Sequence, residues 1–521
     1  MSALRIETDD AALAELFAWA TSTARRFVVE AGTTGPLDVS EATPPPYLQA
    51  VYRPAYHAGY LFRSGYYLRD FAHQAVGAQL LGLGRENRAM LDSFIRTATP
   101  EHGGWPVWAL NFDGVTPLAI DYHGPDRFVR ELPAAFELVE LVHVLYRWTG
   151  DRTLGGHRAH WRRTLGEFVA GRDALRPNGV AEAGGPGIFD GAASYNERPG
   201  SYLLEAGDGI GAQYAALRHA AALEAALGDE EGAGRFAGAA EALAAEFTAR
   251  WGRVPGVGEP GDRDATSATH ADEPAARPTG SAFDGLVSAW LADGRPVAEW
   301  LREATWFLPL KGLLTEDDSR CDAVLDEIDA ACRDARAPSN IEALSYLPDV
   351  FLRHGRADAA YAWMREIHAR RDELHEVPQQ GANGDYPELA FALVGQIVAG
   401  LLGLEPDAGT RRIATRPTLP ASVRRLVASG VPFGRGTLDI GWAEGEGHWL
   451  ENRTPDEILW SPHRTRDRRF RDPHLAVVAG EGDLVRVRPG ERRTVSDAAD
   501  LDREATAARA RSTGAAAVRG R

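Results

Sequence analysis

The sequence predicts a mainly α protein in which a large domain of paired helices precedes a small antiparallel β module. From residue 8 to about 403, apolar residues recur with the spacing of amphipathic helices. After residue 405 the pattern becomes an alternation of period two, punctuated by glycine and proline. At 521 residues the chain is long enough for one large core and a second, smaller unit.

The helical part divides into segments separated by strong helix breakers. Gly82, Gly150, Gly228 and Gly355 end segments, and Pro387 marks a first helical turn. Very short turns join many neighbours, which predicts antiparallel helical hairpins. The expected helices lie near 9–27, 68–82, 86–98, 130–149, 158–173, 206–227, 229–251, 284–293, 297–313, 318–336, 341–354, 356–373 and 387–403.

The connections between hairpins are unequal in length. Long segments at 103–130, 175–205 and 252–280 alternate with the tight turns. Tight turns therefore close one end of the helical array and long loops crowd the other, where binding residues tend to gather. We expect a helical domain at 1–404, the β module at 405–497 and a disordered tail at 498–521.

The charge balance excludes several classes of partner. The formal net charge is −17, whereas nucleic acids and anionic membranes select clustered Lys and Arg. No segment has the length and apolarity of a membrane span. We therefore expect no nucleic-acid partner and no membrane. The charge fits a neutral small-molecule or oligosaccharide ligand, or a cationic one. The only lysine is Lys311, in keeping with the arginine bias of a GC-rich genome.

The cysteines and the N-terminus favour a cytoplasmic protein. Cys321 and Cys332 are eleven residues apart on one predicted helix, roughly 16 Å along its axis, which is too far for a disulfide. The first residues carry acids where a signal peptide carries basic ones. The histidines show no metal-ligand spacing, so no metal and no cofactor is expected.

Three segments resemble the six-hairpin glycosidases, the superfamily of glucoamylases, trehalases and α-L-rhamnosidase-like enzymes. Tyr-Tyr-Leu-Arg-Asp-Phe at 66–71 looks like the segment that opens an inner helix there. Residues 386–405 look like the last inner helix, and 417–434 like the start of the C-terminal sheets. The resemblance covers about 50–490. It implies an (α/α)6 barrel followed by a β-sandwich, with inner-helix N-termini at the active site and a glycoside hydrolase activity.

Three acidic residues at two of these helix starts are the catalytic candidates. Glu205 and Asp208 are three residues apart and can face one side of a helix start, where one would be the general acid. Glu388 follows Pro387, and a helix N-terminus stabilises its ionised form, which suits a general base. Each acid also fits a purely electrostatic role at a helix N-terminus.

Other polar and aromatic residues of the long loops are candidates for substrate binding. Arg69 and Asp70 would hold sugar oxygens, because planar donors and paired acceptors match adjacent hydroxyl groups. The remaining candidates are Trp105, Trp108, Asp121, His123, Asp126, Arg127 and Asp385.

The mechanism expected from these residues is hydrolysis with inversion. One carboxylic acid protonates the leaving oxygen while a carboxylate activates water on the opposite ring face. Two other reactions on the same barrel stay open. A sugar epimerase or isomerase would use paired histidines, for which His57, His73 and His123 are available. A polysaccharide lyase would place Tyr, His and Arg around a uronate.

Overall fold

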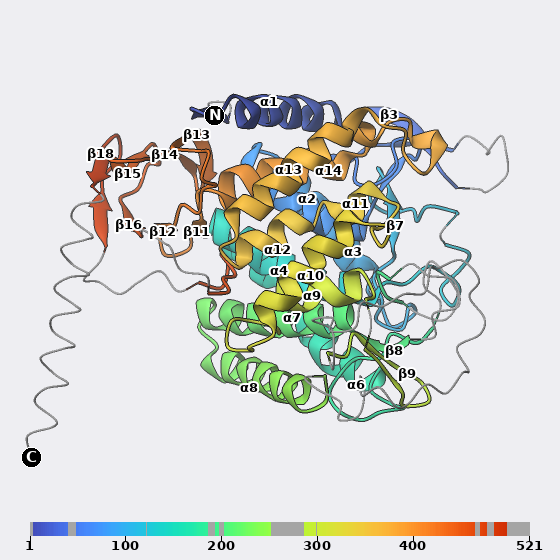
Figure 1. The fold of residues 1–521 in the computed structure, drawn as a ribbon. Coiled ribbons are helices and arrows are strands. Elements are labelled where there is room, and N and C mark those ends of the chain that lie inside the picture. The colour runs from blue at the N-terminus through green and yellow to red at the C-terminus, as the bar shows by residue number, and fades with distance from the viewer. Residues whose placement is uncertain are drawn as a thin grey trace, which may run out of the picture.

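The computed structural model describes residues 4–39, 48–120, 122–185, 193–196, 203–251, 286–298, 300–463, 469–476 and 484–496. It confirms the predicted fold class, a helical barrel followed by a β-sandwich (Figure 1). Asp121 and the tail at 498–521 lie outside the described residues. In the part of the chain that is described, no helix is long and apolar enough to cross a membrane.

A ring of inner helices forms the barrel. α2 packs against α4 and α14, α4 against α7, α7 against α9, and α9 against α12, which in turn contacts the end of the α14 segment. This order places α7 across the ring from α14. The inner helices are α2 (Leu68–Leu80), α4 (Leu132–Thr149), α7 (Gly207–Ala226), α9 (Glu303–Leu310), α11 (Ile341–Leu344) with α12 (Leu347–Arg353), and α14 (Pro387–Gly395) continued by η7 (Gln396–Gly400).

Outer helices pack behind this ring. α2 and α3, α7 and α8, and α12 and α13 form the short-turn hairpins that the sequence predicts. The outer elements are α1 (Ala11–Arg26), α3 (Gly84–Thr97), η1 (Arg152–His157), α5 (Arg158–Arg163), η2 (Thr164–Phe168), α6 (Val169–Gly171), α8 (Glu230–Glu246), η3 (Phe247–Trp251), α10 (Cys321–Arg333) and α13 (Ala357–Ala369). Cys321 and Cys332 are both buried and unpaired in α10, as predicted.

Glycine allows two pairs of elements to approach closely. A Cβ on Gly77 of α2 would lie 1.9 Å from the carbonyl oxygen of Phe391 in α14. A Cβ on Gly207, at the start of α7, would lie 1.8 Å from the carbonyl oxygen of Ala304 in α9. No side chain fits at either point, so these glycines set the spacing of the inner ring.

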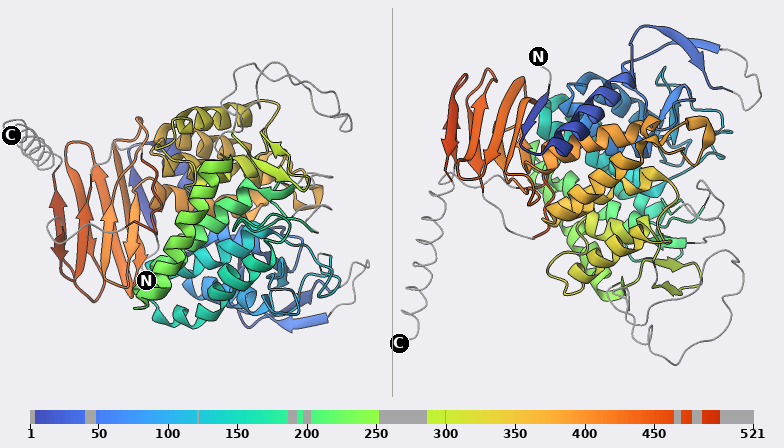
Figure 2. Two further views of the ribbon diagram at one scale, coloured as in Figure 1. Left: turned by 90° about the horizontal axis from the view of Figure 1, so that it is seen from below. Right: turned by 45° about the horizontal axis from the view of Figure 1, so that its top comes forward.

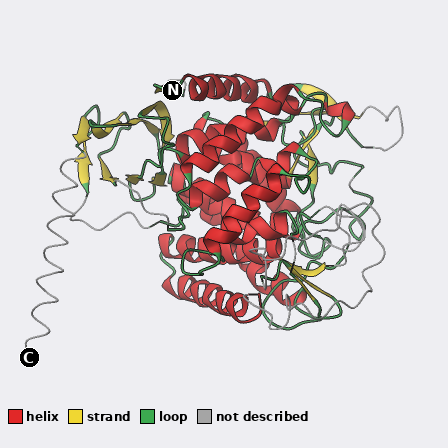
Figure 3. Ribbon diagram, in the orientation of Figure 1, coloured by secondary structure: helices red, strands yellow, loops and turns green. Residues whose placement is uncertain are grey.

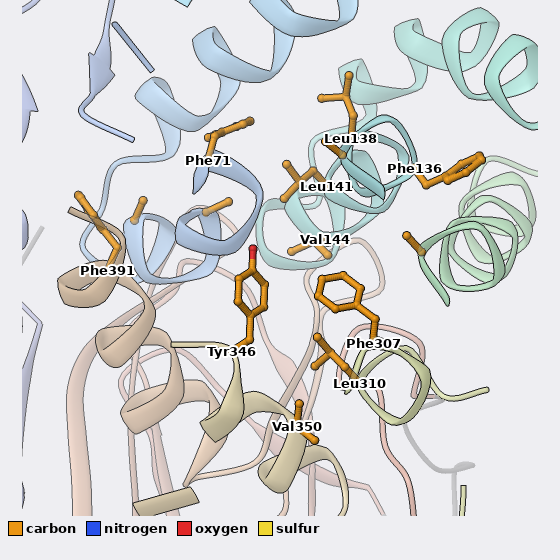
Figure 4. Close-up of a cluster of buried hydrophobic side chains, with 14 of the residues drawn as sticks. Phe71, Phe136, Leu138, Leu141, Val144, Phe307, Leu310, Tyr346, Val350 and Phe391 are labelled. Atoms are coloured by element: carbon orange, nitrogen blue, oxygen red, sulfur yellow. The ribbon is translucent and has the colours of Figure 1, made fainter. Parts of the chain in front are cut away.

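Apolar side chains from the inner helices meet in the barrel interior. Figure 4 shows Tyr346, Phe307 and Leu310 on one side of this cluster and Leu141 and Val144 on the other. All five are buried. Because these side chains come from α4, from α9 and from the turn between α11 and α12, the core ties three parts of the ring together independently of the long loops.

Two sheets form the C-terminal module, which lies beside the helical body (Figure 2). One has the order β1-β13-β14-β15-β18 and the other β11-β12-β16-β17. Pairing is antiparallel except between β12 and β16, which are parallel. The strands are β11 (Leu404–Asp407), β12 (Arg412–Thr415), β13 (Arg425–Phe433), β14 (Gly436–Ala443), β15 (Gly447–Asn452), β16 (Ile458–Pro462), β17 (Val485–Val487) and β18 (Arg492–Val495).

The N-terminal segment also takes part in this module. β1 (Arg5–Thr8) pairs antiparallel with β13, so it covers one edge of a sheet at the far end of the chain. The sequence boundaries place this segment with the barrel. Period-two patterning over four residues contains nothing that identifies a partner strand some 420 residues away.

The long loops carry short strands on the side opposite the sandwich, as Figure 3 shows. They are β2 (Val28–Val29), β3 (Thr34–Leu37), β4 (Leu48–Val51), β5 (Ala55–Tyr56), β6 (Gly65–Tyr67), β7 (Ala109–Asn111), β8 (Leu203–Ala206), β9 (Ala289–Leu291) and β10 (Pro296–Val297). The helix predicted at 284–293 is therefore wrong within its described part, which is strand β9 and a turn. Periodicity alone cannot separate a short buried strand from a helix.

Candidate active site

Polar residues from the starts of the inner helices meet at the end of the barrel away from the sandwich. Tyr386, which precedes α14, donates its hydroxyl hydrogen to Oδ1 of Asp70 in the first turn of α2. Arg69 pairs with Glu131, just before α4, at 3.4 Å. The ring order therefore brings Arg69, Asp70 and the start of α14 together, although more than 300 residues separate them in sequence.

Glu388 lies in the first turn of α14 and is almost fully buried. His73 Nδ1 is 2.6 Å from its Oε1, and Ser345 Oγ donates to the same oxygen at 3.2 Å. His73 Nε2 is 3.0 Å from Oδ2 of Asp349 in the first turn of α12. Burial disfavours the charged form of His73, but the bonds to Asp349 and Glu388 outweigh it and raise the pKa of His73 to about 10.

Asp70 differs from His73 in that its surroundings favour the neutral form of the side chain. Burial, and next the charge of Glu388, raise the pKa of Asp70 well above its usual value, while Arg69 opposes the shift. The structure thus places a carboxyl group that favours its protonated form beside a carboxylate that accepts from an imidazolium. Such a pair can divide proton-donating and proton-accepting roles.

A second group, which the sequence did not single out, adjoins this pair. Glu342, in the first turn of α11, lies 3.2 Å from His375 Nε2. His375 is stacked parallel to Tyr386, with ring centroids 5.4 Å apart. Glu342 also contributes to the raised pKa of Asp70. Glu342 follows the loop Ala-Pro-Ser-Asn as Glu388 follows Pro387, and this first-turn position was the signal that could have identified it.

Buried tyrosines surround the carboxylates. Burial raises the pKa values of Tyr195, Tyr346 and Tyr386 well above the usual tyrosine value, so all three stay neutral and keep a proton to donate. Tyr195 donates to Glu137 Oε2 at 2.6 Å. Arg69 lies over the Tyr195 ring, 5.1 Å from its centroid.

The two acids at the α7 junction differ in surroundings. Asp208 accepts from Ser194 Oγ at 2.8 Å and from the Tyr195 backbone N–H at 2.6 Å. Burial raises the pKa of Asp208 to about 6, against these hydrogen bonds. Through Tyr195, Asp208 is connected to the group that contains Arg69.

Glu205 lies on the other side of this junction. It accepts from Asn178 Nδ2 at 3.0 Å and pairs with Arg176 at 3.3 Å. Burial raises the pKa of Glu205 to about 7, against Arg176 and Asn178. These described partners are not among the groups that contact Asp70 or Glu388, so the structure does not bring Glu205 to that pair.

Of the tryptophans proposed for binding, only Trp108 joins the group. Its Nε1 donates to Glu131 at 2.5 Å, which places it beside Arg69. Trp105 is buried, with Phe168 at its edge and Arg172 5.0 Å from its ring centroid. Trp105 and Asp126 line a separate cavity of about 320 Å³.

The remaining binding candidates lie at the periphery. His123, Asp126 and Arg127 are exposed, and a backbone hydrogen bond joins His123 to Arg127. Asp385 lies 3.6 Å from Arg26 at the end of α1 and accepts from the backbone of Ala382. Among the described residues, no group of three or more His, Cys, Asp or Glu side chains has an arrangement that can hold a metal ion.

An axial cavity of about 190 Å³ extends from this site towards the sandwich. His73, Tyr346 and Asp349 line the end of the cavity near Glu388. Glu405, Arg416 and Arg471 line the end next to the sandwich. Lys311 lies in its wall, bonded to Glu137 at 2.8 Å and Glu140 at 2.9 Å. Polar side chains thus continue along the barrel axis behind Glu388.

The fold and this acid-lined barrel end define a helical-barrel protein with a polar pocket. No protein-family model and no curated protein sequence matches the chain. Among solved structures, it is similar to the GH78 family rhamnosidase of Bacillus sp. GL1, with 15% identity and a TM-score of 0.54 over 85% of this chain and 40% of that one. It is also similar to the α-L-rhamnosidase of Dictyoglomus thermophilum, with 13% identity and a TM-score of 0.54 over 94% and 50%.

A further similar structure is described as a sialidase, with 13% identity and a TM-score of 0.54 over 86% of this chain and 40% of that one. The chain spans half or less of the length of these proteins. These solved structures confirm the fold that the resemblance in the sequence implied, an (α/α)6 barrel followed by a β-sandwich.

Proposed function

We propose that the protein is a glycoside hydrolase that cleaves an oligosaccharide or small glycoside. The observation that carries this proposal is the buried Glu388, bonded through one oxygen to His73 and Ser345 and adjacent to a carboxyl group that favours its protonated form, Asp70. Glycoside hydrolysis needs one carboxylate and one carboxylic acid on opposite sides of the scissile bond. Glu388 and the acid at the start of α7 stand across the ring from each other, and Asp70 beside Glu388 adds a polar group for the sugar.

Glu388 is the proposed general base. In this role it removes a proton from water as the oxygen attacks the anomeric carbon, and the glycosidic bond breaks on the opposite face. Such inversion requires the acid and base to be about 6.5–9.5 Å apart, which leaves room for the water. His73 and Ser345 both bond Oε1, which leaves Oε2 as the oxygen proposed to take the proton from water.

The general acid belongs at the start of α7, across the ring from α14. Asp208 is the better candidate there, because its pKa of about 6 permits a substantial protonated fraction and Tyr195 connects it to Arg69. Glu205 remains the alternative, with a pKa raised to about 7 but with its contacts directed to Arg176 and Asn178. Arg69 and Asp70 are proposed to hold sugar hydroxyl groups.

The other two reactions are supported less well. An epimerase would need a histidine that exchanges a proton with the sugar, whereas both ring nitrogens of His73 are bonded to carboxylates. A lyase would need cations around a uronate, whereas the charge of Glu388 acts on a second carboxyl group, Asp70, and His73 is shared with a third, Asp349.

A panel of neutral glycosides, followed by anomeric-proton NMR, tests the proposal. Release of a reducing sugar of inverted configuration is the expected outcome. Interconversion of a free sugar would indicate an epimerase instead, and an ultraviolet-absorbing unsaturated product would indicate a lyase. A product of retained configuration would reject the inverting roles given to Glu388 and the α7 acid.

A further inference from the structure

His73 joins three inner helices through the two nitrogens of one ring. It extends from α2 to Glu388 on α14 at 2.6 Å and to Asp349 on α12 at 3.0 Å. Tyr346 covers one face of the ring, with centroids 3.9 Å apart and planes within 9° of parallel. The ring therefore has little freedom to rotate, and both of its nitrogens point at carboxylate oxygens.

This geometry selects the charge state of the ring. A neutral imidazole has one N–H and can donate to only one carboxylate, whereas an imidazolium donates to both. Gln396 Nε2 donates to the same oxygen of Asp349 at 2.5 Å, which fixes that carboxylate in turn. Other titratable groups that line the same cavity include Glu137 and Glu140 of α4, Lys311 after α9 and Arg353 of α12, with Glu405, Arg416, Arg469, Arg471 and His474 towards the sandwich.

The contacts also distinguish the two oxygens of Glu388. Among the described residues, both hydrogen bonds to Glu388, from His73 and from Ser345, end on Oε1. Oε2 takes neither of them. A carboxylate whose one oxygen is fixed by a cation keeps the other oriented for a second partner, which in a general base is the attacking water.

We propose that His73 is a positioning residue, a doubly bonded imidazolium that fixes Oε1 of Glu388 and so orients Oε2 toward the attacking water. Asp349 keeps the ring charged and aligned from its other side. The inference rests on the proposed role of Glu388 as the base, and it adds a residue that acts through Glu388 without touching the sugar.

Two substitutions separate the two nitrogens. The amide nitrogen of His73→Asn replaces Nδ1 and keeps a donor to Glu388, whereas that of His73→Gln replaces Nε2 and keeps only the donor to Asp349. We expect kcat to fall about 10²-fold in His73→Gln and clearly less in His73→Asn, with KM little changed in both. Because both variants lose the cation, the acid limb of the pH–kcat profile should move to higher pH in both.

His354→Gln is the matched control. His354 is also buried in an inner-helix setting, where it bonds the backbone carbonyl of Pro309 at 3.0 Å, well away from Glu388. The His354→Gln variant should lose stability, but the acid limb of its pH–kcat profile should stay where it is in the wild type. If His73→Gln and His73→Asn behave like His354→Gln, with unchanged pH profiles, the positioning role is overturned.

Imidazole NMR of the full-length protein tests the contact without any substrate. In the wild type at pH 8 we expect both ring nitrogens of His73 to carry a proton. In Asp349→Asn we expect the ring to lose its charge at a lower pH than in the wild type. A neutral, singly protonated His73 at pH 8 in the wild type would overturn the proposal. A failure to hydrolyse any glycoside would count against the proposed function instead, because the imidazole spectrum does not depend on turnover.

Discussion

Lys311 Nζ lies 2.8 Å from Oε1 of Glu137, so the only lysine of the chain is buried in the wall of the barrel's axial cavity. Glu140 is its second partner, at 2.9 Å. Burial lowers the pKa of a lysine, but the two carboxylates more than offset this and raise the pKa of Lys311. The ammonium group therefore supplies one positive charge to two glutamate side chains that come from successive turns of α4.

Lys311→Met should lower the free energy of unfolding by about 3–5 kcal/mol, because it leaves two buried carboxylates without their cation. Urea unfolding at pH 7 measures this. Arg250→Met is the control, since the Arg250 side chain is about half exposed and its pair with Glu246 should contribute less than about 1 kcal/mol. A loss in Lys311→Met no larger than in Arg250→Met would show that the buried group is not held by charge.

Glu388→Gln should fold normally and lose most of its turnover. Glutamine preserves the size of the side chain but cannot accept the proton of the attacking water, so a decrease of at least about 10²-fold in kcat is expected. Circular dichroism and thermal unfolding check the fold, and a continuous glycosidase assay checks the rate. Activity close to that of the wild type would refute the assignment of the base.

Asp208→Asn and Glu205→Gln, compared side by side, locate the general acid. Loss of an acid matters most for a poor leaving group, so the true acid variant should lose about 10²–10⁴-fold on a natural glycoside and far less on an activated aryl glycoside. We expect this pattern in Asp208→Asn. If only Glu205→Gln shows this pattern, Glu205 is the general acid. If neither variant shows it, the general acid does not lie at the start of α7.

Glu205 should also make stability depend on pH. Its pKa is about 7 in the folded protein against an ordinary 4.5, so the folded state binds more protons between these values. The stabilising contribution of the protonated group is complete below about pH 4.5 and is lost as pH rises through about 7. Glu205→Gln should therefore be more stable than the wild type at pH 8 and similar to it at pH 4.5. Urea unfolding curves of both proteins at pH 8 and pH 4.5 measure this. An equal difference in the free energy of unfolding at the two pH values would contradict the prediction.

Asp10 ties the barrel to the sandwich. Its carboxylate caps α1 through the Leu13 N–H at 3.0 Å and accepts from Tyr361 of α13 at 2.9 Å and from Ser422 of the β module at 3.0 Å. Asp10→Ala should cost about 1–2 kcal/mol, as the loss of a helix cap does. Glu15→Ala on the exposed face of the same helix is the control and should be near neutral.

Two of the three helix starts selected from the sequence occur together at the barrel end, those of Arg69–Asp70 and Glu388. They could be found because a first-turn acid after a long loop is a local pattern. His73, Glu131, Glu137 and Lys311 could not be assigned from sequence, since each depends on a partner from another helix. The strand pair β9–β10 did have a local signal, the Asp293-Gly294 turn, which the helical interpretation overlooked.

The sequence alone determined the helical hairpins, the change to a β module near residue 405 and the acids at the helix starts, because these follow from periodicity and turn chemistry within a few residues. The tertiary structure decided which of those acids meet. Glu205 and Asp208 stand three residues apart, yet one bonds Arg176 and Asn178 while the other bonds Ser194 and the Tyr195 backbone. The order of helices around the ring, which depends on close contacts such as Gly77 with Phe391, determines the partner of each carboxylate and hence its charge.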